Sequence, residues 1–185
     1  MSTKDHQSEP IESASETLQR IFDGHGSVLG SQMADESSRY DVLKKTDFPK
    51  PQRTRRIAVA NQKGGVGKTT STVNTAAALA NKGAQVLVID MDPQGNASTA
   101  LGVSHASGEP SVYDVIEGRS DLGDVITVCP DFPTLDVVPA SIDLSGAELE
   151  VADLPNRNTL LKEALDLYLR QSDKHYDYVF IDCPP

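Results

Sequence analysis

The sequence has little that would place it in a membrane or in an oxidising compartment. It lacks any apolar run of about 18 residues, the length that spans a bilayer as a helix. Its first ten residues, MSTKDHQSEP, lack the basic and apolar segments of a secretion signal. Only two cysteines occur, Cys129 and Cys183, too few for a disulfide scaffold and without metal-site spacing. We therefore expect a soluble, cytoplasmic protein without membrane attachment.

Basic residues are also scarce. Lys and Arg number 17 against 27 Asp and Glu, which gives a formal net charge of −10. Bulk charge therefore argues against a protein that wraps nucleic acid electrostatically, because phosphate binding needs a basic surface. A small basic cluster remains at Arg53, Arg55 and Arg56. It could contact DNA, although charge that flanks a tail is the commoner explanation.

The chain divides by composition near residue 52. Residues 1–52 hold eight serines and only 14 apolar residues, too few to offset the entropy of ordering, so this extension is predicted to be mostly disordered. Within it, Ile11 to Phe22 places apolar residues near one helical face. This pattern indicates either a transient helix in a tail or a docking helix for a partner. Residues 53–185 form the predicted folded portion.

The folded portion alternates between strand and helix patterns. Such alternation implies right-handed crossovers and a mostly parallel β-sheet with helices on both faces, which is an α/β fold. Because the chain stops directly after a strand, at Pro185, we expect a C-terminal truncation whose missing strands cover a bare sheet edge. The predicted buried strands are 57–60, 86–89, 135–138 and 178–181, and the predicted helices are 69–82, 111–117 (with Ser111 and Asp114 as its capping pair), 144–152 and 158–169.

The strongest chemical signal lies between the first strand and the first helix, in residues 61–70 (NQKGGVGKTT). Small residues let backbone N–H groups surround phosphate oxygens, and the helix adds its positive N-terminal end. Lys68 is placed to reach the β- and γ-phosphates, and the Thr69 hydroxyl to bind Mg²⁺. Gln62 departs from the standard pattern, which has glycine there. A glycine-rich surface turn with two solvated lysines is the alternative.

Three aspartates follow predicted strands: Asp90, Asp92 and Asp182. Because the carboxyl ends of parallel strands meet at one edge of the sheet, these side chains are expected near the phosphate loop. In-line phosphoryl transfer needs a metal ion and lysines to neutralise charge, and a positioned water. Taken alone, Asp90 is as well explained by capping the next turn.

These segments resemble the ParA/MinD class of P-loop ATPases, which carries a deviant Walker A motif. Residues 90–98 (DMDPQGNAS) resemble in particular the ParA/Soj partition branch, as do residues 138–148 (VPASIDLSGAE) and 176–185 (YDYVFIDCPP), the latter similar to a Walker B strand and its turn. The resemblance covers about residues 56–185. It implies a P-loop NTPase fold of which only the N-terminal part is present.

The resemblance also implies roles for individual residues. Lys63 is the signature lysine that reaches the partner subunit's ATP across a sandwich dimer, and with Lys68 and Asp92 it forms the catalytic set. Asp92 orients the attacking water, Asp182 holds Mg²⁺ through water, and Asp90 supports the metal region together with Thr69. The implied ATP-binding loop comprises Lys63, Gly64, Gly65, Val66, Gly67, Lys68, Thr69 and Thr70, the last near the α-phosphate.

The function implied by the resemblance is ATP-dependent DNA segregation. ATP and Mg²⁺ would close a homodimer that binds DNA non-specifically, and a ParB-type partner would stimulate a slow ATPase and release it. DNA contacts would come mostly from parts of the fold absent here, and the protein would be cytoplasmic and nucleoid-associated. A MinD-like membrane-cycling ATPase is the alternative; its amphipathic C-terminal helix cannot be inspected in this chain. A fragment that neither folds nor hydrolyses ATP by itself is the third possibility.

Overall fold

The computed structural model describes residues 28–46, 48–146 and 158–185, and the chain forms two compact units, residues 1–48 and 49–185. In the first unit, α2 (Val28–Lys45) is a helix that the sequence analysis did not predict. The predicted helix over Ile11–Phe22 lies outside the described residues, and the disorder of the extension as a whole stays a prediction.

The second unit is built on a five-stranded sheet in the order β1-β5-β2-β4-β3. Four strands run parallel, and short β3 pairs antiparallel with β4. This confirms the predicted mostly parallel sheet. The strands are β1 (Arg55–Val59), β2 (Val86–Asp90), β3 (Thr127–Val128), β4 (Leu135–Val138) and β5 (Tyr178–Asp182).

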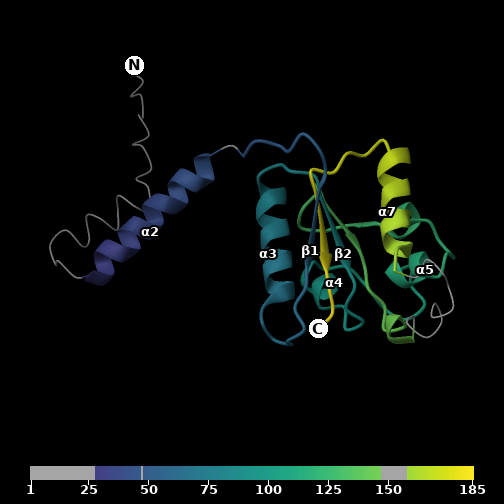
Figure 1. Cartoon of the computed structure of the whole chain (residues 1–185). Helices are drawn as coiled ribbons and strands as arrows, with labels where there is room; N and C mark the ends of the chain where they lie inside the picture. Colours follow the sequence, from purple (N-terminus) through teal and green to yellow (C-terminus); the bar gives the residue numbers. More distant parts are fainter. Residues whose placement is uncertain (1–27, 47, 147–157) are drawn as a thin grey trace, which may run out of the picture. The chain divides into compact units, whose positions relative to one another are not determined.

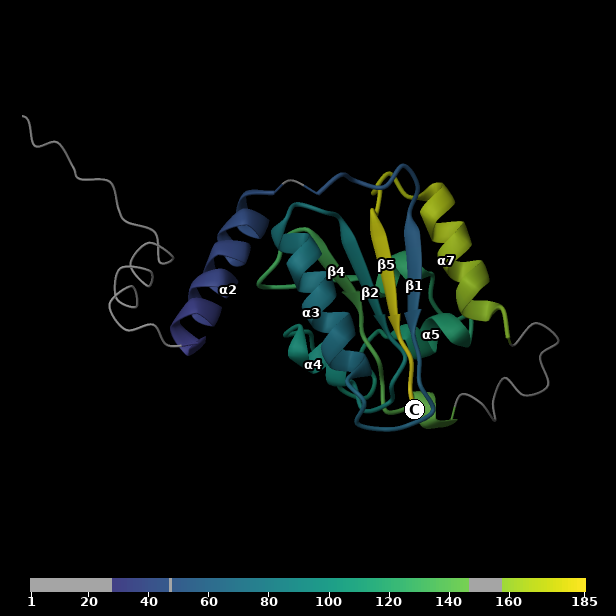
Figure 2. The same cartoon turned by 60° about the vertical axis from the view of Figure 1, so that its left-hand side comes forward.

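Helices cover both faces of the sheet, as Figures 1 and 2 show. On one face α3 (Lys68–Asn81) and α4 (Asn96–Ala100) lie over an apolar layer that includes Val86 and Val88. On the other face α5 (Val112–Ile116) and α7 (Leu160–Gln171) lie over a layer that includes Leu87 and Ile89. Successive β2 side chains alternate between the two layers, as strand geometry requires.

The first predicted strand is present, but its predicted burial is wrong. Residues 55–58 of β1 are exposed, and Ile57 retains 37% of its accessible surface. The physical reason is position: within the described residues β1 pairs with β5 alone, so it is an edge strand. An apolar run predicts a strand, but it does not say whether that strand lies inside the sheet or at its edge.

Three predicted helices, 69–82, 111–117 and 158–169, correspond to α3, α5 and α7. Of the fourth, predicted over 144–152, residues 144–146 are helical and the others lie outside the described part of the chain. Three short elements were not predicted: α4, β3 and the 3-10 turn η1 (Leu122–Val125). They span two to five residues, too few for a periodic pattern. Across the described ranges, no helix has the length and hydrophobicity to cross a bilayer.

The parallel register brings two functional candidates together. Asp90 ends β2 and Asp182 ends β5, and these two residues are direct register partners on neighbouring strands. Val59, the last residue of β1, pairs with Asp182 in the same row. The chain leaves β1 at this row to enter the glycine-rich loop, so the loop and both aspartates share one edge of the sheet.

Candidate nucleotide-binding site

The glycine-rich loop has the backbone of an anion cradle. Gly65 and Gly67 have φ values of 72° and 87°, a left-handed backbone conformation that residues with a Cβ rarely adopt. A Cβ built on Gly64, Gly65 or Gly67 would meet no atom within 4 Å, so the space beside the loop is open. Gly67 is the N-cap of α3, a helix of 14 residues. The loop therefore presents backbone and a helix N-terminus to an open volume, which fits a phosphate chain.

The side chains of the loop divide by exposure. Lys63 is exposed, and its backbone N–H donates to Asn61 Oδ1 at 2.9 Å, which fixes the entry to the loop. Val66 is 45% exposed at the loop's apex. Lys68 and Thr69 are half-buried in the first turn of α3. The structure thus separates Lys63, which faces outward, from Lys68 and Thr69, which lie closer to the sheet.

Asp182 lies at the floor of the site with one oxygen unsatisfied. Its side chain is fully buried, and Oδ1 accepts a hydrogen bond from Thr72 Oγ1 at 3.2 Å. Within the described residues, Oδ2 is buried and has no hydrogen-bond partner. An unpaired buried carboxylate oxygen is costly. A hard divalent cation would satisfy it, so the residues present fit Mg²⁺.

The donor set indicates how such a cation would be held. No group of three or more His, Cys, Asp or Glu side chains is placed to hold a metal anywhere in the described chain. Mg²⁺ commonly relies on one or two carboxylates, with waters and substrate phosphates completing its octahedron. Asp182 and the Thr69 hydroxyl match that sparse pattern, so this site fits a metal that arrives with a nucleotide.

Thr72 is a functional candidate that the sequence analysis missed. Its hydroxyl also donates to the Lys68 carbonyl oxygen, at 3.0 Å, and the side chain is buried. Thr72 therefore connects the first turn of α3 to Asp182. Its position one turn after Lys68 is the only sequence signal, and a helical threonine facing a sheet is too common to stand out.

Both carboxylate oxygens of Asp90 accept hydrogen bonds from other residues of the protein. Oδ1 accepts from the Asp92 backbone N–H at 3.1 Å, and Oδ2 accepts from both the backbone N–H and the hydroxyl of Ser98, each at 2.8 Å. Burial raises the pKa of the Asp90 carboxyl and outweighs these hydrogen bonds, with a small contribution from Asp182 in the same direction. Asp90 thus anchors the following loop, and its part in metal binding stays a prediction.

Asp92 occupies a tight turn beside the end of β5. Its Oδ1 accepts from the Gln94 N–H at 3.0 Å, and its carbonyl oxygen accepts from the Gly95 N–H at 2.8 Å. The Met91 N–H donates to the Asp182 carbonyl oxygen at 3.0 Å, which ties the turn to the Walker B-like strand. The side chain is half-buried. The structure therefore places Asp92 one residue from a direct contact with the Asp182 backbone.

Ser98 links this turn to the segment after β4. Its buried hydroxyl donates to Asp90 and accepts from the Ala140 N–H at 3.2 Å. Ser98→Ala should lower the free energy of unfolding by about 1–3 kcal/mol, because the buried Ala140 N–H loses its acceptor and the Asp90 carboxylate loses one of its hydrogen bonds. Urea denaturation would measure the change, with the exposed Ser104→Ala as the matched control. Equal stability of the two variants would contradict this role.

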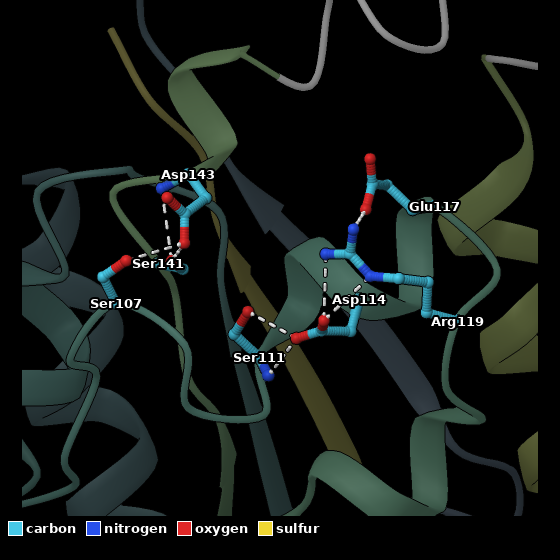
Figure 3. Close-up of polar contacts among 7 residues, drawn as sticks. All are labelled: Ser107, Ser111, Asp114, Glu117, Arg119, Ser141 and Asp143. Atoms are coloured by element: carbon cyan, nitrogen blue, oxygen red, sulfur yellow. Dashed lines mark hydrogen bonds and ion pairs between the residues drawn. The ribbon is translucent and has the colours of Figure 1, made fainter.

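A second polar cluster, shown in Figure 3, serves the scaffold. The Asp114 carboxylate accepts from the Ser111 N–H at 2.9 Å and from its hydroxyl at 3.1 Å, which confirms the predicted capping pair. Although burial acts the other way, these bonds and Arg119 lower the pKa of Asp114. Arg119 also forms an ion pair with Glu117.

The same view shows Asp143 after β4, where its Oδ2 accepts from the hydroxyls of Ser141 at 2.8 Å and Ser107 at 3.3 Å. This carboxylate joins the loop that contains Ser107 to the segment that follows β4. Asp143 belongs to the motif over residues 138–148, of which residues 147–148 lie outside the described part of the chain.

Comparisons with known proteins identify relatives of this chain. A family model described as an AAA domain matches residues 54–185. The chain is 47% identical over 129 residues to sporulation initiation inhibitor protein Soj of Bacillus subtilis (strain 168), covering 70% of this chain and 49% of the relative. It is also 47% identical over 129 residues to chromosome partitioning protein ParA of Caulobacter vibrioides (strain NA1000 / CB15N), covering 70% and 47%. The chain thus spans about half the length of these relatives.

Among solved structures, one described as cobyrinic acid a,c-diamide synthase from Mycobacterium smegmatis, with bound ATP analog and magnesium, is similar. The TM-score is 0.64 at 40% identity, over 71% of this chain and 52% of that chain. The shared fold therefore includes a protein that binds an ATP analog together with magnesium.

Proposed function

This chain belongs to the ParA/Soj-type branch of the AAA domain family, and on that premise we propose that it carries the ATP site of a DNA-segregation switch. The observation that carries the proposal is the juxtaposition of a glycine cradle with a buried Asp182 oxygen that has no partner among the described residues. A nucleotide with its divalent cation supplies what each part lacks: phosphate oxygens for the backbone N–H groups, and positive charge for the carboxylate.

We assign each loop residue a part in binding. Gly64, Gly65, Val66 and Gly67 form the cradle, Lys68 contacts the β- and γ-phosphates, and Thr70 lies near the α-phosphate. Thr69 and Asp182 hold Mg²⁺, which supplies charge neutralisation when bound. Thr72 keeps Asp182 and the first turn of α3 in register, since its hydroxyl bonds to both. Asp90 supports this region through the turn that it anchors.

The proposed reaction is hydrolysis of ATP to ADP and phosphate. Asp92 orients the attacking water, because its carboxylate lies on a turn fixed at both ends beside Asp182. Little covalent chemistry is required of the protein, so catalysis rests on placing charge and water. A slow basal rate that a ParB-type protein stimulates is part of the proposal.

The switch itself rests on a dimer. We propose that ATP closes a homodimer in which Lys63 of each subunit reaches the other subunit's nucleotide, since Lys63 is exposed at the mouth of the loop. A nucleotide that contacts both subunits binds the dimer more tightly than the monomer, which is the condition for a switch. The dimer binds DNA non-specifically, so the protein is nucleoid-associated, and hydrolysis releases it.

Lys63→Ala tests the trans contact. The full-length variant should bind ATP as the wild type does, yet lose the ATP-dependent dimer, because Lys63 contributes to the partner's site rather than to its own. Light scattering with ATP and Mg²⁺ would report the mass, and Lys82→Ala, just after the far end of α3, is the matched lysine control. An intact dimer in the Lys63 variant would remove the trans role.

A further inference from the structure

The ring of His105 lies directly on Gly95. A Cβ added to Gly95 would stand 2.5 Å from His105 Cε1 and Nδ1 and 2.9 Å from its Cγ. Gly95 also has a φ of 61°, a conformation that favours glycine. Two independent reasons, backbone conformation and close approach of the ring, therefore favour glycine at this position. The contact is specific: a half-buried ring covers a buried backbone.

The same ring also reaches Thr99, at the other end of the first turn of α4. His105 Nε2 lies 2.9 Å from Thr99 Oγ1, and the Thr99 N–H donates to the Gly95 carbonyl oxygen at 2.9 Å. The imidazole thus spans the first turn of α4, in contact with Gly95 at one end and hydrogen-bonded to Thr99 at the other. It holds the loop after α4 against the start of that helix.

Gly95 in turn closes the turn that carries Asp92. Its N–H donates to the Asp92 carbonyl oxygen at 2.8 Å, while the Gln94 N–H bonds to the Asp92 carboxylate. From the buried side, Asp90 and Ser98 anchor the turn. At its other end, the turn is covered by the His105 ring, which lies on Gly95. The backbone of the turn that carries Asp92 is therefore held between a buried hydrogen-bond network and one half-buried side chain.

We propose that His105 is a positioning residue for ATP hydrolysis: by covering Gly95 it keeps the Asp92 turn closed and the Asp92 carboxylate in place. This inference rests on the proposed function, since it needs Asp92 to orient the attacking water. His105 acts through Gly95 rather than on the reacting atoms. Its effect should therefore fall on turnover and spare nucleotide binding, because the phosphate loop is on a different segment.

The test compares His105→Ala, His105→Phe and wild type in the full-length protein. Phosphate release at saturating ATP and Mg²⁺ gives kcat, and calorimetry with a non-hydrolysable ATP analog gives Kd. We expect His105→Ala to lower kcat about five- to fiftyfold, which is less than the roughly 100-fold that a 1 Å misplacement of a reacting group can cost. Its Kd and its thermal unfolding midpoint should match the wild type.

The phenylalanine variant separates positioning from general damage. Phe keeps a flat ring over Gly95 and loses only the bond to Thr99, so His105→Phe should retain most of the wild-type kcat. The exposed His175→Ala is the matched histidine control and should hydrolyse ATP normally. If His105→Ala turns over at the wild-type rate, or if His105→Phe is as slow as His105→Ala, the proposal is overturned.

A double-mutant cycle with Gly95→Ala tests the contact itself. In wild type the added methyl meets the His105 ring, so Gly95→Ala should lower kcat by a larger factor there than in the His105→Ala background. Equal factors would contradict the contact. Asp92→Asn separates this inference from the function beneath it: rapid turnover by that variant removes the proposed role of Asp92, whereas a slow Asp92→Asn beside a fast His105→Ala removes only the role of His105.

Discussion

Lys68→Ala should abolish useful ATP binding by the full-length protein. Lys68 stands in the first turn of α3, where the loop opens toward the free space beside its glycines. Removal of one partner of a hydrogen-bonded charge pair costs about 2–5 kcal/mol, so we expect the Kd for ATP to rise by roughly 30-fold to several thousandfold. Isothermal calorimetry with ATP and Mg²⁺ would measure the change.

The control for this variant lies at the other end of α3, just outside the helix. Lys82 follows the last residue of α3, so Lys82→Ala also removes a lysine but leaves the proposed phosphate site intact. It should bind ATP as the wild type does. If Lys68→Ala retains wild-type affinity while correctly folded, the assignment of residues 61–70 as the phosphate loop is wrong.

Asp92→Asn should preserve ATP binding and dimer formation but lower turnover roughly 100-fold or more, the usual contribution of a side chain that positions or deprotonates a reactant. Asparagine is a more specific substitution than alanine, because its side-chain oxygen can still accept the hydrogen bond from the Gln94 N–H that closes the turn. The variant therefore removes charge while keeping the turn. Release of phosphate from pre-bound ATP in a single turnover would measure the effect.

Asp131→Ala is the matched acidic control, since Asp131 is exposed in a turn remote in sequence from the site. Its turnover should equal that of the wild type. A comparison with Asp92→Ala adds information: if the alanine variant is slow and the asparagine variant fast, Asp92 acts by closing its turn and not through its charge. Fast turnover in both would end its catalytic assignment.

The sequence predicted the parts of the fold that have a long or repeated signal. Apolar runs at β2, β4 and β5 identified buried strands, and the spacing in α3 identified a helix, because burial on a sheet imposes these patterns. The edge position of β1 was not predictable in this way. Exposure of Ile57 depends on which strands pair beside it, a property of the sheet and not of the local run.

The candidate site also has features that a local sequence pattern predicts and features that depend on the folded structure. The glycine-rich loop between β1 and α3 could be predicted, because its glycines, lysine and threonine stand at fixed spacing within ten residues, and its role in phosphate binding stays a proposal. The hydrogen bond between Thr72 and Asp182 could not be predicted, because these residues are 110 positions apart in the sequence, and neither could the Asp182 oxygen that has no partner in the described part of the chain. Nor could the anchoring of Asp90 by Ser98, because it depends on where the short helix α4 places Ser98. The contact between His105 and Gly95 likewise exists only in three dimensions.

Sedimentation of the full-length protein tests the central claim most directly. The runs compare ADP with ATP plus Mg²⁺, each with and without random-sequence DNA, and a parallel run uses anionic liposomes. The account predicts a dimer with ATP alone that comigrates with DNA and dissociates from it at high salt, as phosphate contacts do. A dimer that ignores DNA and pellets with the liposomes, or a monomer under every condition, would contradict it.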